Sequence, residues 1–515
     1  MENKSQLKSG IVLSYVNLIV GNLVPLFYTP IMLRILGQSE YGLYSLATSV
    51  TSYLSLMSLG ISSAVVRYLV KFRAKGDADG EGKMLGLFSC IFYVIAALTL
   101  VVGCIIALNI DILYGASLTT NELAKIKLLT VLLTVNSALS FAFTVYGSVV
   151  IAHERFVFQQ ILNVITTILP AFLNIGVLLL GFSSVGLVVT SLVLSMITYV
   201  VKIVYCAKKI NIKPIFHDMP FHLLKELLYF SFFIFVSNVV NTLHAATDKV
   251  IIGSYLGTVA TAVYNVGLTF RNIVQSLSTS ISGLLVPKVT TLVDTNASTD
   301  ELTHLMTKVG RLQFLLVGLA VGGFCAFGRE FIVLYAGEEY SQSYLVAIML
   351  MIPMIVPLIQ NVGVSIINAM NKHRFRALVT LFTAILNVIT TIWLVQYWGI
   401  IGAAFTTCCC NFIGSIALMN WYYYKKIKLN ILLFWKNIAR LAIVPCSLTI
   451  LTLFLSKFID YTNPLIFIVG VIVYTALYAL LMLPILNDYE KDVIKGFIYK
   501  FTRRNKNVNE KNRAS

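Results

Sequence analysis

The chain has 515 residues, of which 58% are hydrophobic and only 12% are charged. This composition excludes an ordinary soluble globular protein, in which about 25% of residues are charged. Apolar runs of about 20 residues, the length that spans a bilayer, recur along the chain. We therefore predict an all-α polytopic membrane protein, and the net charge of +17 needs no nucleic-acid partner to explain it.

Fourteen apolar segments follow one another along the chain, and each is long enough for one membrane-spanning helix. The first begins close to the N-terminus and is too long for the core of a signal peptide, so we expect it to be retained. The segments cover residues 10–33, 43–66, 84–108, 126–150, 160–181, 186–206, 228–253, 259–286, 309–331, 343–367, 377–397, 400–423, 438–458 and 463–485.

The positions of the basic residues predict the orientation of these segments. Most of the 39 Lys and Arg residues fall in alternate connections. The positive-inside rule places such connections in the cytoplasm. An even number of spans with both termini cytoplasmic satisfies the rule, and the same residues would attract the anionic lipids of the inner leaflet.

Polar residues gather between residues 237 and 282, inside otherwise apolar sequence. We expect two long helices here, with a break between Gly253 and Gly257. Steps of three and four residues place the polar residues of each helix on one face, which then meets protein or water. The polar residues are Ser237, Asn241, His244 and Asp248 on the first helix and Tyr264, Arg271, Gln275, Ser278 and Ser282 on the second.

The second of these polar stripes has a counterpart 220 residues earlier. The corresponding positions are also polar, and they are Tyr44, Thr51, Ser55, Ser58 and Ser62. Leu36-Gly37 corresponds to Leu256-Gly257 in the same way. Segments one to six therefore repeat in segments seven to twelve, and since six is an even number, the two halves are parallel repeats with a binding site expected between them.

This repeat predicts the division of the chain. We expect two six-helix lobes, two further helices, and an interfacial helix that leads into a cytoplasmic tail. The predicted ranges are 1–209 for the first lobe, 210–427 for the second, 428–487 for the two C-terminal helices and 488–515 for the interfacial helix and tail.

Three charged residues, Asp248, Lys249 and Arg271, lie inside predicted spans. A charge at the bilayer centre costs about 2.5–3.5 kcal/mol on insertion scales, so each needs a partner or a wet cavity. The guanidinium of Arg271 suits a phosphate group, or it pairs with Asp248. Asp248 is a candidate site for proton or sodium coupling, or it forms a salt bridge with Arg271 or Lys249. These alternatives stay open.

Other polar residues also have two interpretations. His244 either relays protons or is a hydrogen-bonded packing residue. Arg34 and Arg67, at the ends of the first two spans, contact a head group or a gate, or they anchor the helices by reaching the interface. Lys249 is a further candidate for a head-group or gate contact. No nucleophile with its base, phosphate-binding loop or metal-ligand cluster appears, and the eight cysteines lie in apolar runs or at their ends. We predict no enzyme activity, no cofactor and no metal.

One group of motifs resembles a known family. The motifs are Arg34-Ile35-Leu36-Gly37, Glu40-Tyr41-Gly42-Leu43-Tyr44, Ser58-Leu59-Gly60, Arg67, Thr247-Asp248-Lys249, Ile251, Gly253, Leu256-Gly257, Tyr264 and Pro287. With them, residues 10–485 resemble the Wzx-type polysaccharide flippases of the multidrug/oligosaccharidyl-lipid/polysaccharide exporter (MOP) superfamily. The resemblance implies two lobes around a central cavity. It also implies that the protein moves an oligosaccharide on undecaprenyl pyrophosphate from the inner to the outer leaflet of the bacterial cytoplasmic membrane.

The resemblance also implies roles and partners. Arg271 would contact the head group, and Asn241, His244, Tyr264 and Gln275 would line the cavity. The partners would be the lipid-linked oligosaccharide, membrane lipids and other proteins of surface-polysaccharide assembly.

Three alternatives to this function are weighed. The first is an ion-coupled drug antiporter that uses Asp248. The second is a lipid II flippase, which is disfavoured because such proteins typically carry several cationic residues in the first lobe, whereas here Thr51 occupies the position that corresponds to Arg271. The third is a glycan polymerase, which is disfavoured because the outer connections are short.

Overall fold

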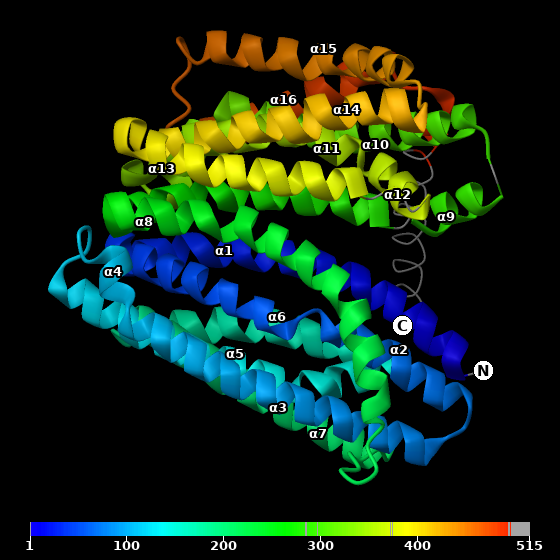
Figure 1. The fold of residues 1–515 in the computed structure, drawn as a ribbon. Coiled ribbons are helices and arrows are strands. Elements are labelled where there is room, and N and C mark those ends of the chain that lie inside the picture. The colour runs from blue at the N-terminus through cyan, green and yellow to red at the C-terminus, as the bar shows by residue number, and fades with distance from the viewer. Residues whose placement is uncertain are drawn as a thin grey trace, which may run out of the picture. The chain divides into compact units, whose positions relative to one another are not determined.

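The computed structural model describes residues 2–283, 286–295, 297–370, 372, 374–492 and 495. Every regular element in these ranges is a helix (Figure 1). The described chain forms two compact units, the first made of residues 1–269 and 377–410 and the second of residues 270–376 and 411–515. The predicted boundaries at residues 209 and 427 divide the chain by sequence repeat and stay a prediction.

The first unit consists of long helices that run beside one another, with α3, α5 and α7 as neighbours (Figure 1). Clusters of buried apolar side chains pack between these helices, and one cluster includes Leu46, Tyr114 and Leu129. Its elements are α1 (Glu2–Ser52), η1 (Tyr53–Ser58), α2 (Ile61–Ala74), α3 (Ala78–Leu108), α4 (Ile110–Tyr114), α5 (Thr120–Ala152), α6 (Phe156–Leu179), α7 (Ser184–Tyr205), η2 (Cys206–Ile210), η3 (Phe221–Leu223) and most of α8 (Leu224–Gly283) and of α13 (Arg374–Asn411).

The second unit packs around α10, which contacts α11, α15 and α16. Its core includes Phe314, Phe327 and Phe434. Its elements are the end of α8, α9 (Val286–Asp294), α10 (Thr299–Ala336), η4 (Glu338–Tyr340), α11 (Ser343–Ile359), α12 (Asn361–Ala369), η5 (Phe412–Leu418), α14 (Met419–Tyr422), η6 (Tyr423–Ile427), α15 (Ile431–Leu455) and α16 (Pro464–Met482).

Ten helices of the described chain are long and apolar enough to cross a membrane, and eleven if the bent pair α11 and α12 is one span. Large apolar side chains lie on their outer surfaces, including Phe172, Trp393 and Leu465, whose exposed fractions are 70, 63 and 73%. Such a surface suits lipid, since the helices satisfy their own backbone hydrogen bonds. The chain is an all-α polytopic membrane protein, as predicted.

Two of the long helices are interrupted at the glycines that the sequence repeat relates. Gly37 in α1 has φ 73° and ψ 174°, and Gly257 in α8 has φ 80° and ψ −164°. Glycine adopts positive φ without the steric cost that a Cβ atom brings. The break predicted between Gly253 and Gly257 therefore falls at Gly257, and it has a counterpart at Gly37.

The sequence repeat extends to finer local structure, with a spacing of 217 residues. The rings of Phe158 and Tyr205 stack with centroids 3.7 Å apart, and those of Phe375 and Tyr422 stack at 4.3 Å. Each tyrosine directly precedes a π-helical turn, η2 or η6, and each turn ends at a residue with positive φ, either Asn211 or Lys428. Equivalent sequence has therefore folded into equivalent helix ends in the two units.

Candidate functional site

A buried polar cluster surrounds Asp248 in the first unit. The side chain of Asp248 is 6% exposed, and its Oδ2 accepts hydrogen bonds from the hydroxyl of Tyr264 at 2.7 Å and from Oγ1 of Thr407 at 2.7 Å. Tyr264 is completely buried. Asp248 and Tyr264 lie on the two sides of the break in α8, and Thr407 comes from α13, so the cluster depends on the contact between these helices.

The hydrogen-bond network continues along α13. Asn387 is buried and donates from Nδ2 to Oγ1 of Thr407 at 2.8 Å. One turn further, the hydroxyls of Thr391 and Thr406 lie 2.6 Å apart. Directly before Asp248 in α8, Oγ1 of Thr247 lies 2.8 Å from the hydroxyl of Tyr53. Carboxylate, hydroxyl and amide groups therefore meet inside a set of apolar helices.

This cluster has the chemistry of a site for a proton or for an alkali cation. Each charge inside a membrane protein needs a partner, and buried acidic residues in such helices commonly mark ion pathways. Hard cations take oxygen ligands from carboxylates, carbonyls and hydroxyls. Among the described residues there is no group of three or more His, Cys, Asp or Glu side chains that could hold a metal ion.

Two of the other predicted site residues, Arg271 and Gln275, belong to the second unit. Arg271 lies in the second unit, where it is half-buried and its Nη1 donates to Oδ1 of Asn272 at 3.3 Å. Gln275 lies one turn further along α8 and is also half-buried. A pairing of Arg271 with Asp248 would join the two units and stays a prediction.

The remaining candidates lie in the first unit. Asn241 is exposed, Lys249 is half-buried, and Arg34 and Arg67 are exposed. The side chain of His244 lies outside the described residues, so its predicted role is untested.

Sequence reasoning missed Thr407 and Asn387. Thr407 lies 159 residues away from Asp248, and neither Thr407 nor Asn387 is ionisable, so neither stood out within the apolar segments. In the sequence, both residues are marked only by being polar within spans of the second repeat. Polar residues in such spans face protein or water, as the stripe on α8 does.

A second residue that sequence reasoning missed is Arg311. It is 3% exposed, and its guanidinium binds both carboxylate oxygens of Glu490, through Nε at 2.6 Å and Nη2 at 2.8 Å. The same guanidinium donates to the carbonyl oxygens of Asn437 and Ile485. Arg311 therefore holds the start of the C-terminal segment against α10 and α15.

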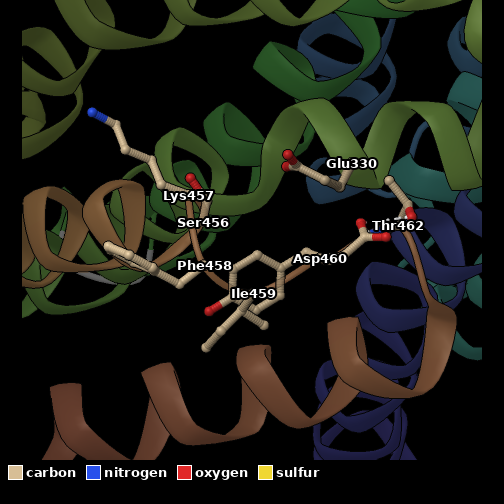
Figure 2. Close-up of a pocket in the computed structure, with 8 residues that line it drawn as sticks. Glu330, Ser456, Lys457, Phe458, Ile459, Asp460 and Thr462 are labelled. Atoms are coloured by element: carbon tan, nitrogen blue, oxygen red, sulfur yellow. Dashed lines mark hydrogen bonds between the residues drawn. The ribbon is translucent and has the colours of Figure 1, made fainter.

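The second unit also has a pocket of about 350 Å³ beside the connection from α15 to α16 (Figure 2). Glu330 of α10 faces this connection, while the amine of Lys457 points away (Figure 2). Hydrogen bonds from the side chain and backbone of Thr462 lower the pKa of the Asp460 carboxyl. This carboxylate is exposed and already accepts hydrogen bonds within a local turn. We therefore assign no function to the pocket.

Comparison with solved structures identifies the fold. The lipid II flippase MurJ, in an inward closed conformation, matches with a TM-score of 0.70 at 15% identity, over 92% of this chain and 98% of that chain. The Vibrio cholerae MATE transporter VcmN in its bent form matches with a TM-score of 0.55 at 15% identity, over 82 and 97%. A MOP superfamily transporter from Pyrococcus furiosus gives 0.52 at 13% identity, over 80 and 94%. The fold is that of the membrane transporters of the MOP superfamily.

A family model assigns the chain more narrowly. The model described as polysaccharide biosynthesis protein matches residues 31–345, more than half of the chain. The chain belongs to this polysaccharide biosynthesis protein family. None of the curated proteins compared with it matches.

Proposed function

We propose that the chain is a flippase that moves an undecaprenyl-pyrophosphate-linked oligosaccharide from the inner to the outer leaflet of a bacterial cytoplasmic membrane. The observation that carries this proposal is the family match to polysaccharide biosynthesis in a chain with the fold of a lipid II flippase. A sugar-pyrophosphate head cannot enter hydrocarbon without losing its hydrogen bonds to water. A protein with polar groups inside a helical bundle provides the alternative path.

The proposal includes fourteen spans with both termini in the cytoplasm. Three of the ten candidate spans have 47, 39 and 54 residues, whereas about 20 residues suffice to cross the bilayer. Each of the three contains a glycine with non-helical angles, at Gly37, Gly257 or Gly399. If each of these three is counted as two spans, and α11 with α12 as one, the total is fourteen spans. The distribution of basic residues supports the orientation.

Arg271 is proposed to contact the pyrophosphate. Its guanidinium stays charged and offers several donors to phosphate oxygens. We expect Arg271→Ala to reduce surface-glycan export by about tenfold or more, the effect of losing one hydrogen bond to a charged group. Arg271→Lys should retain part of the activity. The matched control is Arg329→Ala, which removes an exposed cation near the end of α10 and should leave export unchanged.

Asp248 is proposed to couple transport to a proton or a sodium ion. Its buried carboxylate and the oxygens of Tyr264, Thr407 and Asn387 supply the chemistry that either ion requires. We expect Asp248→Asn to remove the dependence of export on the ion gradient while leaving substrate binding in place. Export that still follows the gradient in this variant would assign coupling to another residue.

The experiment that tests the function is leaflet-resolved labelling of undecaprenyl-linked oligosaccharide in cells with and without the protein. Flipping predicts that the oligosaccharide accumulates on the inner leaflet without the protein and that adding the protein back reverses this. An unchanged distribution would contradict the proposal. It would favour an ion-coupled drug antiporter, which the MATE-like fold and the Asp248 cluster support, and cells without the protein would then be drug-sensitive but keep their glycan.

A further inference from the structure

One carboxylate in the first unit connects the two helix breaks that the sequence repeat relates. Oε1 of Glu122, at the start of α5, accepts hydrogen bonds from Oγ of Ser39 at 2.7 Å and from Oγ1 of Thr258 at 2.9 Å. Ser39 lies two residues after Gly37, and Thr258 directly follows Gly257. We call Ser39, Glu122 and Thr258 the Glu122 clasp.

The other carboxylate oxygen holds Glu122 in place. Oε2 accepts from the backbone N–H of Thr119 at 3.0 Å and from its Oγ1 at 2.9 Å, which completes the capping box at the start of α5. A capping box fixes both the helix start and the glutamate side chain. Glu122 is therefore a positioned acceptor, and Oε1 is the oxygen that faces the two breaks.

The helices that the clasp connects also approach one another very closely. A Cβ atom added to Gly42 would lie 2.0 Å from the carbonyl oxygen of Thr258. Ser117, just before α5, donates from Oγ to the carbonyl oxygen of Gly253 at 2.7 Å. The segments around Gly37 and Gly257 are thus held together at one end of the unit by hydrogen bonds and by close packing.

A neighbouring carboxylate provides a useful contrast. Glu40 accepts from Lys125 and from Oγ of Ser184, which lies at the start of α7. These three residues belong to segments one to six, so this cluster stabilises the first repeat internally. The Glu122 clasp differs because Thr258 belongs to the second repeat.

We propose that the Glu122 clasp is the gate that closes the transport path toward the outer face. The inference rests on the proposed function, which requires the path to open at one face at a time and places residues 39, 122 and 258 outside. The clasp suits this role because Glu122 is only half-buried. Water can replace the two hydroxyl donors when the breaks move apart, so that opening leaves no buried polar group unpaired.

Cysteine labelling in intact cells tests the gate without any substrate. The reporter is Thr261→Cys, in a variant whose native cysteines are replaced and which retains export, because Thr261 is completely buried one turn beyond Thr258. We expect Glu122→Gln to increase labelling by an impermeant maleimide from outside by roughly fivefold or more, the effect of weakening one charged hydrogen-bond acceptor. Ser184→Ala, the matched control, should leave the labelling rate unchanged.

A disulfide that holds the gate closed provides the second test. The side-chain oxygens of Ser39 and Thr258 lie 3.4 Å apart, so cysteines at both positions come within reach of a disulfide with an S–S bond of about 2 Å. We expect oxidation of the Ser39→Cys/Thr258→Cys protein to stop glycan export and reduction to restore it. Each single-cysteine variant should export under both conditions.

The outcomes separate the gate from the substrate. Unchanged labelling in Glu122→Gln, absence of the disulfide, or continued export by the oxidised double variant would each overturn the gate. If the native protein moves no glycan in the leaflet experiment, the proposed substrate fails, whereas the labelling result still decides whether the clasp opens and closes an outer path.

Discussion

At the scale of single residues, the polar residues of the stripe predicted on the second half of α8 differ in their burial and in their partners. Tyr264, predicted to line a cavity, is completely buried with its hydroxyl on Asp248. Arg271, from the same predicted stripe, is half-buried in the other unit. The stripe thus contains both completely buried and half-buried residues, and helical spacing alone does not distinguish them.

Tyr264→Phe tests how much the buried hydroxyl of Tyr264 contributes to stability. Removing the hydroxyl takes one donor from a buried carboxylate, which costs about 1–3 kcal/mol. We expect a lower melting temperature of the purified protein in detergent, and the matched control Tyr255→Phe, at a ring that is 48% exposed, should leave it unchanged. The effect should largely vanish in the Asp248→Asn background, since the two residues share one interaction.

Glu490→Gln tests the buried ion pair with Arg311. The side chains are 4 and 2% exposed, and removing one charge of such a pair costs about 3–5 kcal/mol because the other is left buried without compensation. Asp79→Asn, which breaks the more exposed pair with Lys83, should cost about 1 kcal/mol or less. Equal losses of thermal stability in the two variants would contradict this difference.

At the scale of elements, close approach between helices depends on small residues at particular turns. Gly42 of α1 meets the backbone of α8 at Thr258, whereas Gly21 of the same helix has nothing within 4 Å of an added Cβ atom. Helix contacts in membranes rely on such small residues, because lipid competes with apolar side chains for packing.

Gly42→Ala and Gly21→Ala therefore form a matched pair. The first substitution forces α1 and α8 apart, and overpacking of this kind costs about 1–3 kcal/mol or more. The second adds a methyl group to an open helix surface and should be neutral or slightly stabilising, since alanine favours helix over glycine by about 1 kcal/mol. Thermal unfolding of the two purified variants checks the difference.

At the scale of the whole molecule, the number of spans decides on which side each connection lies. If Gly37 separates two spans, Lys75 lies on the same side of the membrane as the N-terminus. If α1 and η1 cross once, Lys75 lies on the opposite side. The helix breaks therefore have a consequence for topology as well as for local structure.

Single-cysteine labelling decides between these topologies. In the fourteen-span arrangement, Lys75→Cys should react only after the cells are permeabilised, and Ile112→Cys, at a residue that is 81% exposed, should react with an impermeant reagent in intact cells. The reverse pattern would support a single crossing for residues 12–58. The control is the cysteine-replaced protein without either reporter, which should not react.

Much of the architecture follows from local sequence. Long apolar segments predict the membrane helices, because only hydrogen-bonded helices satisfy the backbone in lipid. The repeat predicts that Gly37 and Gly257 are equivalent, and both interrupt a helix with similar positive φ values. Such features depend on residues close together in the chain, so a pattern read along the sequence contains them.

Tertiary structure alone decided which distant residues meet. Asp248 acquires Thr407, and Glu122 acquires both Ser39 and Thr258, although Thr, Ser and Glu are common in helices and mark no partner by spacing. A hydrogen bond needs donor and acceptor within about 3 Å, and the packing of whole helices sets that distance. Sequence by itself determined the class of fold, its repeat and its helix breaks, whereas helix packing decided the composition of the polar clusters.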